Sequence, residues 1–432
     1  MKNRLYVVTS LLVFWLTSPS AAGAVSEWQL EKVVEISRHG VRPPTPGTRK
    51  EIEAATRRAW PRWSAIDGEL TRHGYRAVVN KGRAEGDYYR QLGLIPAGCP
   101  DAQAVYVRAS PLQRTRATAQ ALMEGAFSGC DVLIHHVDGD VDPLFQTEKL
   151  AVAQLDPQQE LAAVSTAAGD LSALQRQLQP AVQQLKASVC PSVENCPFFD
   201  RPWQLKQTRS GHVYVQGLSA MASMVETLRL AWSENLPLSE VAFGNISRAA
   251  QISALLPLLA ANDDLSNSVP YMARRRGSML LNAVIENLEP GANAALPDAR
   301  WLLLVAHDTN IAMLRTLIGF QWQLTGYARG NIPPGGSLVF ERWRERSSGK
   351  RFLRVYFQAQ SLDQLRQLQV PDPQHPQLRA EWHEANCRLT PVGTLCPYQS
   401  LLSRWQQAVD RQALIPVNYL LKTTVKPPQE NQ

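Results

Sequence analysis

The chain has 432 residues, a length that corresponds to two or three domains or to one large domain with an insertion. Its composition, with 44% hydrophobic and 19% charged residues, excludes wholesale disorder, collagen-like repeats and a coiled coil. The formal net charge is +7, and Lys2 and Arg4 supply two of the positive charges within the first 24 residues. So small a surplus argues against a nucleic acid partner, which requires clustered Lys and Arg.

The first 24 residues have the layout of a secretory signal peptide. A basic start is followed by an apolar run from Leu5 to Leu16 and by small residues that end at Ala24. Because this run is too short to span a bilayer comfortably, we expect cleavage after Ala24 rather than a signal anchor. The mature chain is then expected in the periplasm or outside the cell, without stable membrane insertion.

Three segments share one pattern, at 33–44, 104–123 and 301–319. Each begins with a short apolar or β-branched run, continues with polar residues, and passes into a helical stretch or a turn. Runs of this kind are typical of buried strands in a parallel sheet. Functional residues are then expected just past the carboxyl ends of the strands.

Polar residues after two of these runs are expected to begin helices. Ser110 can cap the helix that follows the second run, with Pro111 at its first position. Asp308 or Thr309 can cap the helix that follows the third run.

The segment 146–240 is richer in Gln, Ala and Leu at helical spacing, which predicts a mainly helical insertion. The flanking parts, 25–145 and 241–432, form the predicted α/β core. Within that core, the segments 337–343 and 352–359 alternate as strands at the edges of a sheet do.

Six cysteines fall in three groups along the chain: Cys99 and Cys130, Cys190 and Cys196, Cys387 and Cys396. An even number agrees with an oxidising compartment. Six cysteines allow fifteen pairings, and the close spacing within each group favours local bridges. The absence of C-x-x-C argues against a zinc ribbon or thioredoxin-type chemistry.

The most informative motif is Arg-His-Gly-Val-Arg-Pro-Pro at 38–44. Arg38 and Arg42 flank His39, and guanidinium groups match the oxygens of a phosphate. Their charge would lower the pKa of His39 and keep one ring nitrogen free as a nucleophile at mildly acid pH. Gly40 would allow the backbone to turn tightly. The alternative is a surface loop with an incidental histidine.

Two further motifs are set aside. Arg-His-Gly recurs at 72–74 without the second arginine or the prolines, so His73 is expected to be a capping or surface residue. The cluster of His and Asp at 135–142 resembles a metal site. On a strand, however, His135 and His136 would point to opposite faces, so we expect a turn at the end of a strand.

A second candidate site, His307-Asp308, follows the apolar run 301–306. A histidine at the end of a strand can bind a phosphate oxygen, and the adjacent carboxyl group can protonate a departing alkoxide. The alternative is a helix cap at Asp308 with a packed His307.

The motifs at 38–44 and 307–310 together resemble the histidine acid phosphatase family, in the branch that includes bacterial phytases and glucose-1-phosphatases. The similarity extends over most of the mature chain through 112–120, 142–145, 333–343 and the cysteine groups. The resemblance implies a phosphoglycerate-mutase-like central sheet with helices on both faces and a smaller, mainly helical domain. The implied substrate is a small phosphate ester bound between them, and no metal or cofactor is needed.

The resemblance also implies roles for particular residues. His39 matches the nucleophile that forms a phosphohistidine, and Asp308 matches the proton donor to the leaving group. Four residues match the phosphate clamp: Arg38, Arg42, Arg114 and His307. Arg114 matches the family's arginine, although spacing alone does not separate it from Arg116.

Four positions match places where family members determine substrate specificity: Thr45, Met224, Arg276 and Thr309. Glu226 is a further candidate, because it is adjacent to Thr227 and an alignment shifted by one residue would bring it to the same place. Pro46, Ser110 and Thr227 stand where phytases commonly have Lys, Asp and Glu. The resemblance therefore leaves two substrate classes open, phytate and sugar phosphates, the latter as in a glucose-1-phosphatase.

Two other functions are weighed against hydrolysis. A phosphomutase is disfavoured by the secretory signal, because its usual metabolites are cytoplasmic. A non-catalytic phosphate-binding protein is disfavoured because binding alone needs neither His39 nor Asp308.

Overall fold

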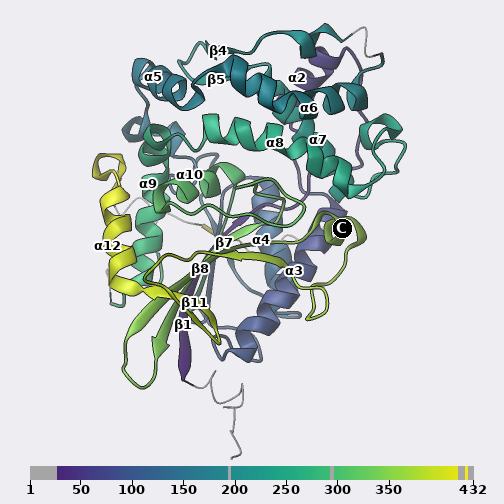
Figure 1. Ribbon diagram of the computed structural model, residues 1–432. Helices are drawn as coiled ribbons and strands as arrows, with labels where there is room; N and C mark the ends of the chain where they lie inside the picture. The colour runs from purple at the N-terminus through teal and green to yellow at the C-terminus, as the bar shows by residue number, and fades with distance from the viewer. Residues whose placement is uncertain (1–26, 193–195, 292–295, 417–423, 427–432) are drawn as a thin grey trace, which may run out of the picture.

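The computed structural model describes residues 27–192, 196–291, 296–416 and 424–426. It consists of an α/β core on one ten-stranded sheet and a helical layer above it (Figure 1). This confirms the predicted fold class. The expected signal peptide lies outside the described residues, and every helix within the described ranges is too short or too polar to cross a bilayer.

The sheet has the strand order β10-β11-β8-β7-β1-β6-β2-β3-β12, with β9 paired to β8. Its strands are β1 (Trp28–Arg38), β2 (Val105–Ala109), β3 (Ile134–His136), β6 (Trp301–Ala306), β7 (Ser337–Glu345), β8 (Arg351–Ala359), β9 (Leu378–Glu381), β10 (Arg388–Thr390), β11 (Gly393–Pro397) and β12 (Thr424–Lys426). The predicted strands β1, β6 and β2 are parallel neighbours, as expected. Their apolar sequences reflect burial on both faces of the sheet.

Helices cover both faces of the sheet, which confirms that expectation. On one face lie α3 (Arg72–Gln91) and α4 (Gln113–Ala126), and on the other α9 (Pro270–Leu288), α10 (Asp308–Ile318) and α12 (Tyr398–Ala408) (Figure 1). A short helix, α11 (Leu362–Gln367), packs against the helical layer.

The helical layer contains α2 (Pro46–Thr56), α5 (Pro157–Ala168), α6 (Leu171–Val189), α7 (Leu218–Ser233), α8 (Ala249–Ser266) and a hairpin of β4 (Gln204–Gln207) and β5 (Val213–Gln216). Both α2 and α8 pack against α7, although they lie outside the segment 146–240. The division into a core of 25–145 and 241–432 and an insertion at 146–240 stays a prediction.

The expected edge position of two strands is wrong. β7 lies between β1 and β8, and β8 also pairs with β9 and β11, so both are internal strands. The polar residues that alternate with apolar ones in these two strands are buried and hydrogen-bonded. Glu341, for example, is fully buried and accepts hydrogen bonds from Tyr356 Oη and Trp343 Nε1, both at 2.8 Å.

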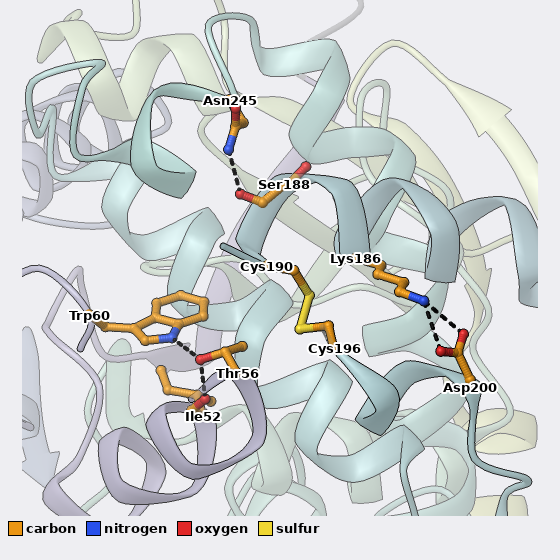
Figure 2. Close-up of a disulfide and its surroundings, with 9 residues drawn as sticks. All are labelled: Ile52, Thr56, Trp60, Lys186, Ser188, Cys190, Cys196, Asp200 and Asn245. Atoms are coloured by element: carbon orange, nitrogen blue, oxygen red, sulfur yellow. Dashed lines mark hydrogen bonds and ion pairs between the residues drawn. A yellow bond between two sulfur atoms is a disulfide. The ribbon is translucent and has the colours of Figure 1, made fainter. Parts of the chain in front are cut away.

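All three local disulfides are present: Cys99–Cys130, Cys190–Cys196 and Cys387–Cys396. Figure 2 shows Cys190–Cys196, which connects the end of α6 to a short 3₁₀ segment at Pro197–Asp200. The preference for bridges within each group is therefore confirmed.

Candidate active site

Three loops meet at one edge of the sheet, where the parallel strands β1, β2 and β6 end. The backbone N–H of His39 donates to the carbonyl of Ala306 at 3.1 Å, and that of Ser110 donates to Val305 at 3.0 Å. Because parallel strands present their carboxyl ends together, residues far apart in the sequence become neighbours here. The helical layer faces this edge (Figure 1).

His39 is held as a neutral imidazole. It is buried, and its Nδ1 lies 2.9 Å from the carbonyl oxygen of Gly40. Because a carbonyl only accepts, Nδ1 carries the proton and Nε2 keeps a lone pair. Burial lowers the pKa of His39 well below its usual value of 6.5, and three cations lower it further: Arg42, Arg38 and Arg114.

Gly40 is required by packing and not by a left-handed turn. Its φ is not positive, which corrects the expected role in a tight turn. A Cβ at this position would lie 2.8 Å from Cγ2 of Val78 and 2.9 Å from Cδ1 of Leu70. Its N–H donates to Thr118 Oγ1 at 2.9 Å, which ties the motif to α4.

Arg38 is fully buried and anchored by three groups. Nη1 donates to the carbonyl of Ile332 at 2.6 Å, while Nη2 donates to Glu226 Oε1 at 2.5 Å and lies 3.0 Å from Asp308 Oδ2. Burial alone would lower the pKa of Arg38, but Asp308 and Glu226 raise it above its ordinary value. Arg38 is therefore a fixed cation that joins α7 to α10.

Arg42 and Arg114 carry charges that no carboxylate compensates by an ion pair among the described residues. Their hydrogen bonds go to backbone carbonyls, from Arg42 Nη1 to Pro43 at 2.9 Å and from Arg114 Nη1 to Gly68 at 3.3 Å. Burial, together with the other two arginines, lowers the pKa of Arg42 to about 10. Crowded guanidinium groups of this kind favour an anion among them.

The structure brings Arg114, and not Arg116, into this group. Arg114 is close enough to lower the pKa of His39, and its own pKa is lowered by burial and by Arg38. Residues two positions apart on a helix point in nearly opposite directions, so the helix α4 directs only one of the two arginines toward His39.

His307 faces His39, with ring centroids 5.7 Å apart, and its Nε2 lies 3.0 Å from the hydroxyl of Ser110. Burial and the charge of Arg114 lower the pKa of His307 to about 3, so its ring is neutral. The expected capping role of Ser110 is wrong, because Leu112 is the N-cap of α4. Ser110 is instead a buried partner of His307, and its place just past β2 was the signal for this.

Asp308 is the first residue of α10 and does not cap it. The N-cap is His307, whose N–H donates to Asn310 Oδ1 at 3.1 Å, so the expected cap at Asp308 or Thr309 is wrong. The carboxylate points instead to Arg38. Burial alone would raise the pKa of Asp308, but Arg38 and the neighbouring cations lower it to about 2. A phosphate dianion would offset these cations and raise that pKa again.

Two residues near the reaction centre belong to no motif that we identified. Arg229 is buried, forms an ion pair with Glu226 and donates to Asn331 Oδ1 at 2.5 Å. The spacing of Glu226 and Arg229 on one helix could have indicated this pair. Asp263, on α8, has a pKa that burial and the charge of Asp308 raise to about 7. No sequence signal marks it.

A cavity of about 150 Å³ lies beside Arg42, between α2, α7 and α8. Glu226, Thr227, Ser223 and Thr48 line it together with Arg42. Glu226 therefore faces both the cavity and Arg38.

The other proposed specificity positions have different surroundings. Thr45 is the N-cap of α2, and the N–H of Thr309 donates to Asp308 Oδ1 at 3.1 Å. Met224 is completely buried in the core of the helical layer. Arg276 lies on α9, and among the described residues no hydrogen bond or ion pair connects it to Arg38, Arg42 or Arg114.

The motifs set aside earlier have structural partners. His73 lies in the first turn of α3, and its Nε2 is 2.8 Å from a backbone carbonyl of α11. His135 stacks on Tyr106 with ring centroids 4.4 Å apart, and Asp142 forms a buried ion pair with Arg108.

Comparison with known proteins points to one family. A family model described as histidine phosphatase superfamily (branch 2) matches residues 29–358. The glucose-1-phosphatase of Salmonella typhimurium is 30% identical over 92% of this chain and 97% of that protein. Phytase AppA of Escherichia coli is 32% identical over 85% of this chain and 89% of that protein.

Solved structures of phytases have the same fold. The phytase of Klebsiella sp. ASR1 is 62% identical, with a TM-score of 0.89 over 91% of this chain and 99% of that chain. The phytase of Hafnia alvei in complex with tartrate is 30% identical, with a TM-score of 0.82 over 90% of this chain and all of that chain.

Proposed function

The chain belongs to branch 2 of the histidine phosphatase superfamily and is a hydrolase of phosphomonoesters, and on this basis we propose that it is a periplasmic phytase that works through His39 and Asp308. The periplasmic location rests on the signal-like first 24 residues. The choice of phytate, myo-inositol hexakisphosphate, rests on the 62% identity to a phytase over nearly the whole chain.

One observation carries the catalytic proposal: a neutral imidazole lies among cations and opposite a carboxyl group. Nε2 of His39 has a free lone pair, and Arg42 and Arg114 favour an anion beside it. Asp308 is held by Arg38 at the same edge of the sheet. A phosphate dianion fits this distribution of charge.

In the first step, Nε2 of His39 attacks the phosphorus atom of the ester. The phosphorus–nitrogen bond forms as the phosphorus–oxygen bond to the alcohol breaks. The proton of the Asp308 carboxyl group goes to the departing oxygen, and the alcohol leaves. The charge on the equatorial oxygens is stabilised by donors held in advance: Arg38, Arg42, Arg114 and His307.

In the second step, water attacks the phosphohistidine. The phosphorus–nitrogen bond breaks, and the Asp308 carboxylate takes a proton from the water. Inorganic phosphate leaves, and His39 returns to the neutral form that its hydrogen bond to Gly40 favours.

The nucleophile is tested by rapid-quench trapping with ³²P-labelled phytate. We expect acid-labile label on the wild-type protein, and no label with at least about a thousandfold lower activity for His39→Ala. His73→Ala is the matched control, because it removes the histidine of the second Arg-His-Gly string, and it should keep both label and activity. Label on His39→Ala would contradict the assignment.

A sugar phosphatase is the second candidate, since two glucose-1-phosphatases are 29–30% identical to this chain. Initial rates on phytate and on glucose 1-phosphate separate the two. We expect kcat/KM to be at least about tenfold higher for phytate, a difference of about 1.4 kcal/mol in transition-state stabilisation. The reverse order would replace phytate by sugar phosphates and leave the His39 mechanism in place.

A further inference from the structure

A second cavity, of about 330 Å³, lies in the helical layer between α2, the start of α7 and the 3₁₀ segment Pro197–Asp200. It adjoins the smaller cavity beside Arg42, because Ser219 lines both. Ser223, of the smaller cavity, donates to Glu51 of the larger one at 3.0 Å. The two cavities therefore follow one another along the groove between α2 and α7, away from His39.

Two guanidinium groups in this second cavity lack a counterion. Arg57 and Arg201 both line it and are exposed. Within the described ranges of the chain, neither side chain forms an ion pair or a hydrogen bond. Guanidinium groups bind phosphate oxygens strongly and keep their charge at all relevant pH values, so the pair favours an oxyanion.

The backbone that carries Arg57 is held in place. Arg57 follows Thr56, whose hydroxyl donates to the carbonyl of Ile52 at 2.7 Å and accepts from Trp60 Nε1 at 3.0 Å (Figure 2). These contacts fix the end of α2, from which the Arg57 side chain starts.

The backbone that carries Arg201 is held as well. Arg201 follows Asp200, whose two carboxylate oxygens each accept from Lys186 Nζ at 2.8 Å (Figure 2). The disulfide Cys190–Cys196 fixes the other end of the same segment. Because both arginines start from ordered backbone, binding would cost less conformational entropy than in a free loop.

The start of α7 lines the same cavity through Gly217, Ser219 and Ala220. Gly217, the N-cap, lines the cavity; no side chain caps the helix and no acidic residue lies in its first turn. Unpaired N–H groups at the N-terminus of a helix favour an anion.

We propose that this cavity binds a phosphate group, through Arg57 and Arg201, at a site separate from the reaction centre at His39. The inference extends the proposed function, because a hexakisphosphate bound at His39 carries five more phosphates. The same chemistry would also accept free inorganic phosphate, the product. Glu51 lines the cavity too, and its charge opposes the ligand.

The test compares Arg57→Gln/Arg201→Gln with Arg209→Gln/Arg300→Gln. The control pair removes the same charge from exposed positions outside the cavity. Calorimetric titration of the full chain uses myo-inositol hexakisulfate, which is not hydrolysed, and inorganic phosphate. With inorganic phosphate we expect two sites per chain in the wild type and the control, and one site in Arg57→Gln/Arg201→Gln. With the hexakisulfate we expect weaker binding in Arg57→Gln/Arg201→Gln than in the control. Glu51→Gln should tighten the second site, because it removes the opposing charge and keeps an acceptor for Ser223.

Steady-state kinetics then distinguish a distal phosphate of the substrate from free inorganic phosphate as the group that binds in this cavity. If the site holds a distal phosphate of the substrate, Arg57→Gln/Arg201→Gln should raise KM for phytate several-fold and leave kcat/KM for p-nitrophenyl phosphate unchanged. If it takes free phosphate, KM for phytate should stay constant while the second phosphate site disappears from the titration.

Titrations that are the same for Arg57→Gln/Arg201→Gln and the control would overturn the proposal. If the protein does not hydrolyse phytate, the proposed substrate is wrong, but the titrations still decide whether Arg57 and Arg201 form a site.

Discussion

In the proposed mechanism, Asp308 has to satisfy two opposing demands as the proton donor. Its contact with Arg38 positions the carboxyl group but also holds its pKa at about 2, so it is ionised in the free protein. A proton donor must be protonated when the ester bond breaks. The phosphate dianion itself resolves this, because it neutralises the cations that lower the pKa of Asp308. Protonation of the donor is therefore coupled to substrate binding.

Asp308→Asn should affect esters according to their leaving group. An inositol alkoxide needs a proton to depart, so we expect phytate hydrolysis to fall by about 10²–10⁴-fold. p-Nitrophenolate leaves without protonation, so its rate should fall by about tenfold or less. Steady-state kcat on both esters at one pH measures the difference. Equal losses on the two substrates would argue against a proton donor at Asp308.

At the scale of the secondary structure elements, the start of α10 organises the proposed reaction centre. His307 and Asp308 occupy its first positions, and Asn310 caps it through the N–H of His307. The other end of the Asn310 amide donates to the carbonyl of Phe145 at 2.8 Å. One buried side chain thus connects α10 to the loop that follows β3.

Asn310→Ala should destabilise the protein and lower its kcat. Loss of a cap and of a buried hydrogen bond costs about 1–3 kcal/mol in the free energy of unfolding. We also expect kcat to fall by about tenfold or more, because His307 and Asp308 lose their anchor. Urea unfolding and kcat on phytate measure the two effects. Thr316→Ala, near the other end of α10, is the control and should leave kcat unchanged; a loss of stability with unchanged kcat in Asn310→Ala would contradict this role.

At the scale of the whole molecule, buried carboxyl groups make stability depend on pH. Burial, with the adjacent charge of Glu35, raises the pKa of Glu85 to about 7, and burial raises that of Glu234 to about 7 as well. In the unfolded chain both carboxyl groups have a pKa of about 4.3. Between these values the folded state holds protons that the unfolded state has released, so stability falls as pH rises from about 4.5 to 7. Asp308 and Glu226, with lowered pKa values, act oppositely, and their contribution is lost as pH falls below about 4.

The melting temperature should therefore be higher at pH 5 than at pH 7.5. Glu85→Gln keeps the shape of the side chain but does not titrate, so it should reduce this difference in melting temperature. The corresponding change in the free energy of unfolding is on the order of 1–3 kcal/mol. Glu148→Gln, at an exposed position, is the matched control. Differential scanning calorimetry at both pH values makes the comparison. An unchanged pH dependence in Glu85→Gln would show that this carboxyl group does not contribute.

The strands, their common edge and the local disulfides could be predicted from the sequence alone, because these features follow from residues that are close together in the chain. The apolar runs before 38–44 and 307–310 predicted parallel strands, and the common edge of such strands predicted that His39 and Asp308 would meet. The close spacing of the cysteines predicted local disulfides, which form.

Only the tertiary structure decided the contacts between residues that are distant in the chain. Glu226 meets Arg38 across 188 positions because the helical layer packs against the edge of the sheet. Ser110 meets His307 across 197 positions because β2 and β6 are neighbours in the sheet. The same holds for the internal position of β7 and β8, for the close packing at Gly40, and for the cavity that brings Arg57 to Arg201. Periodicity and motifs describe which face of an element is buried, whereas partners across layers depend on how the elements pack.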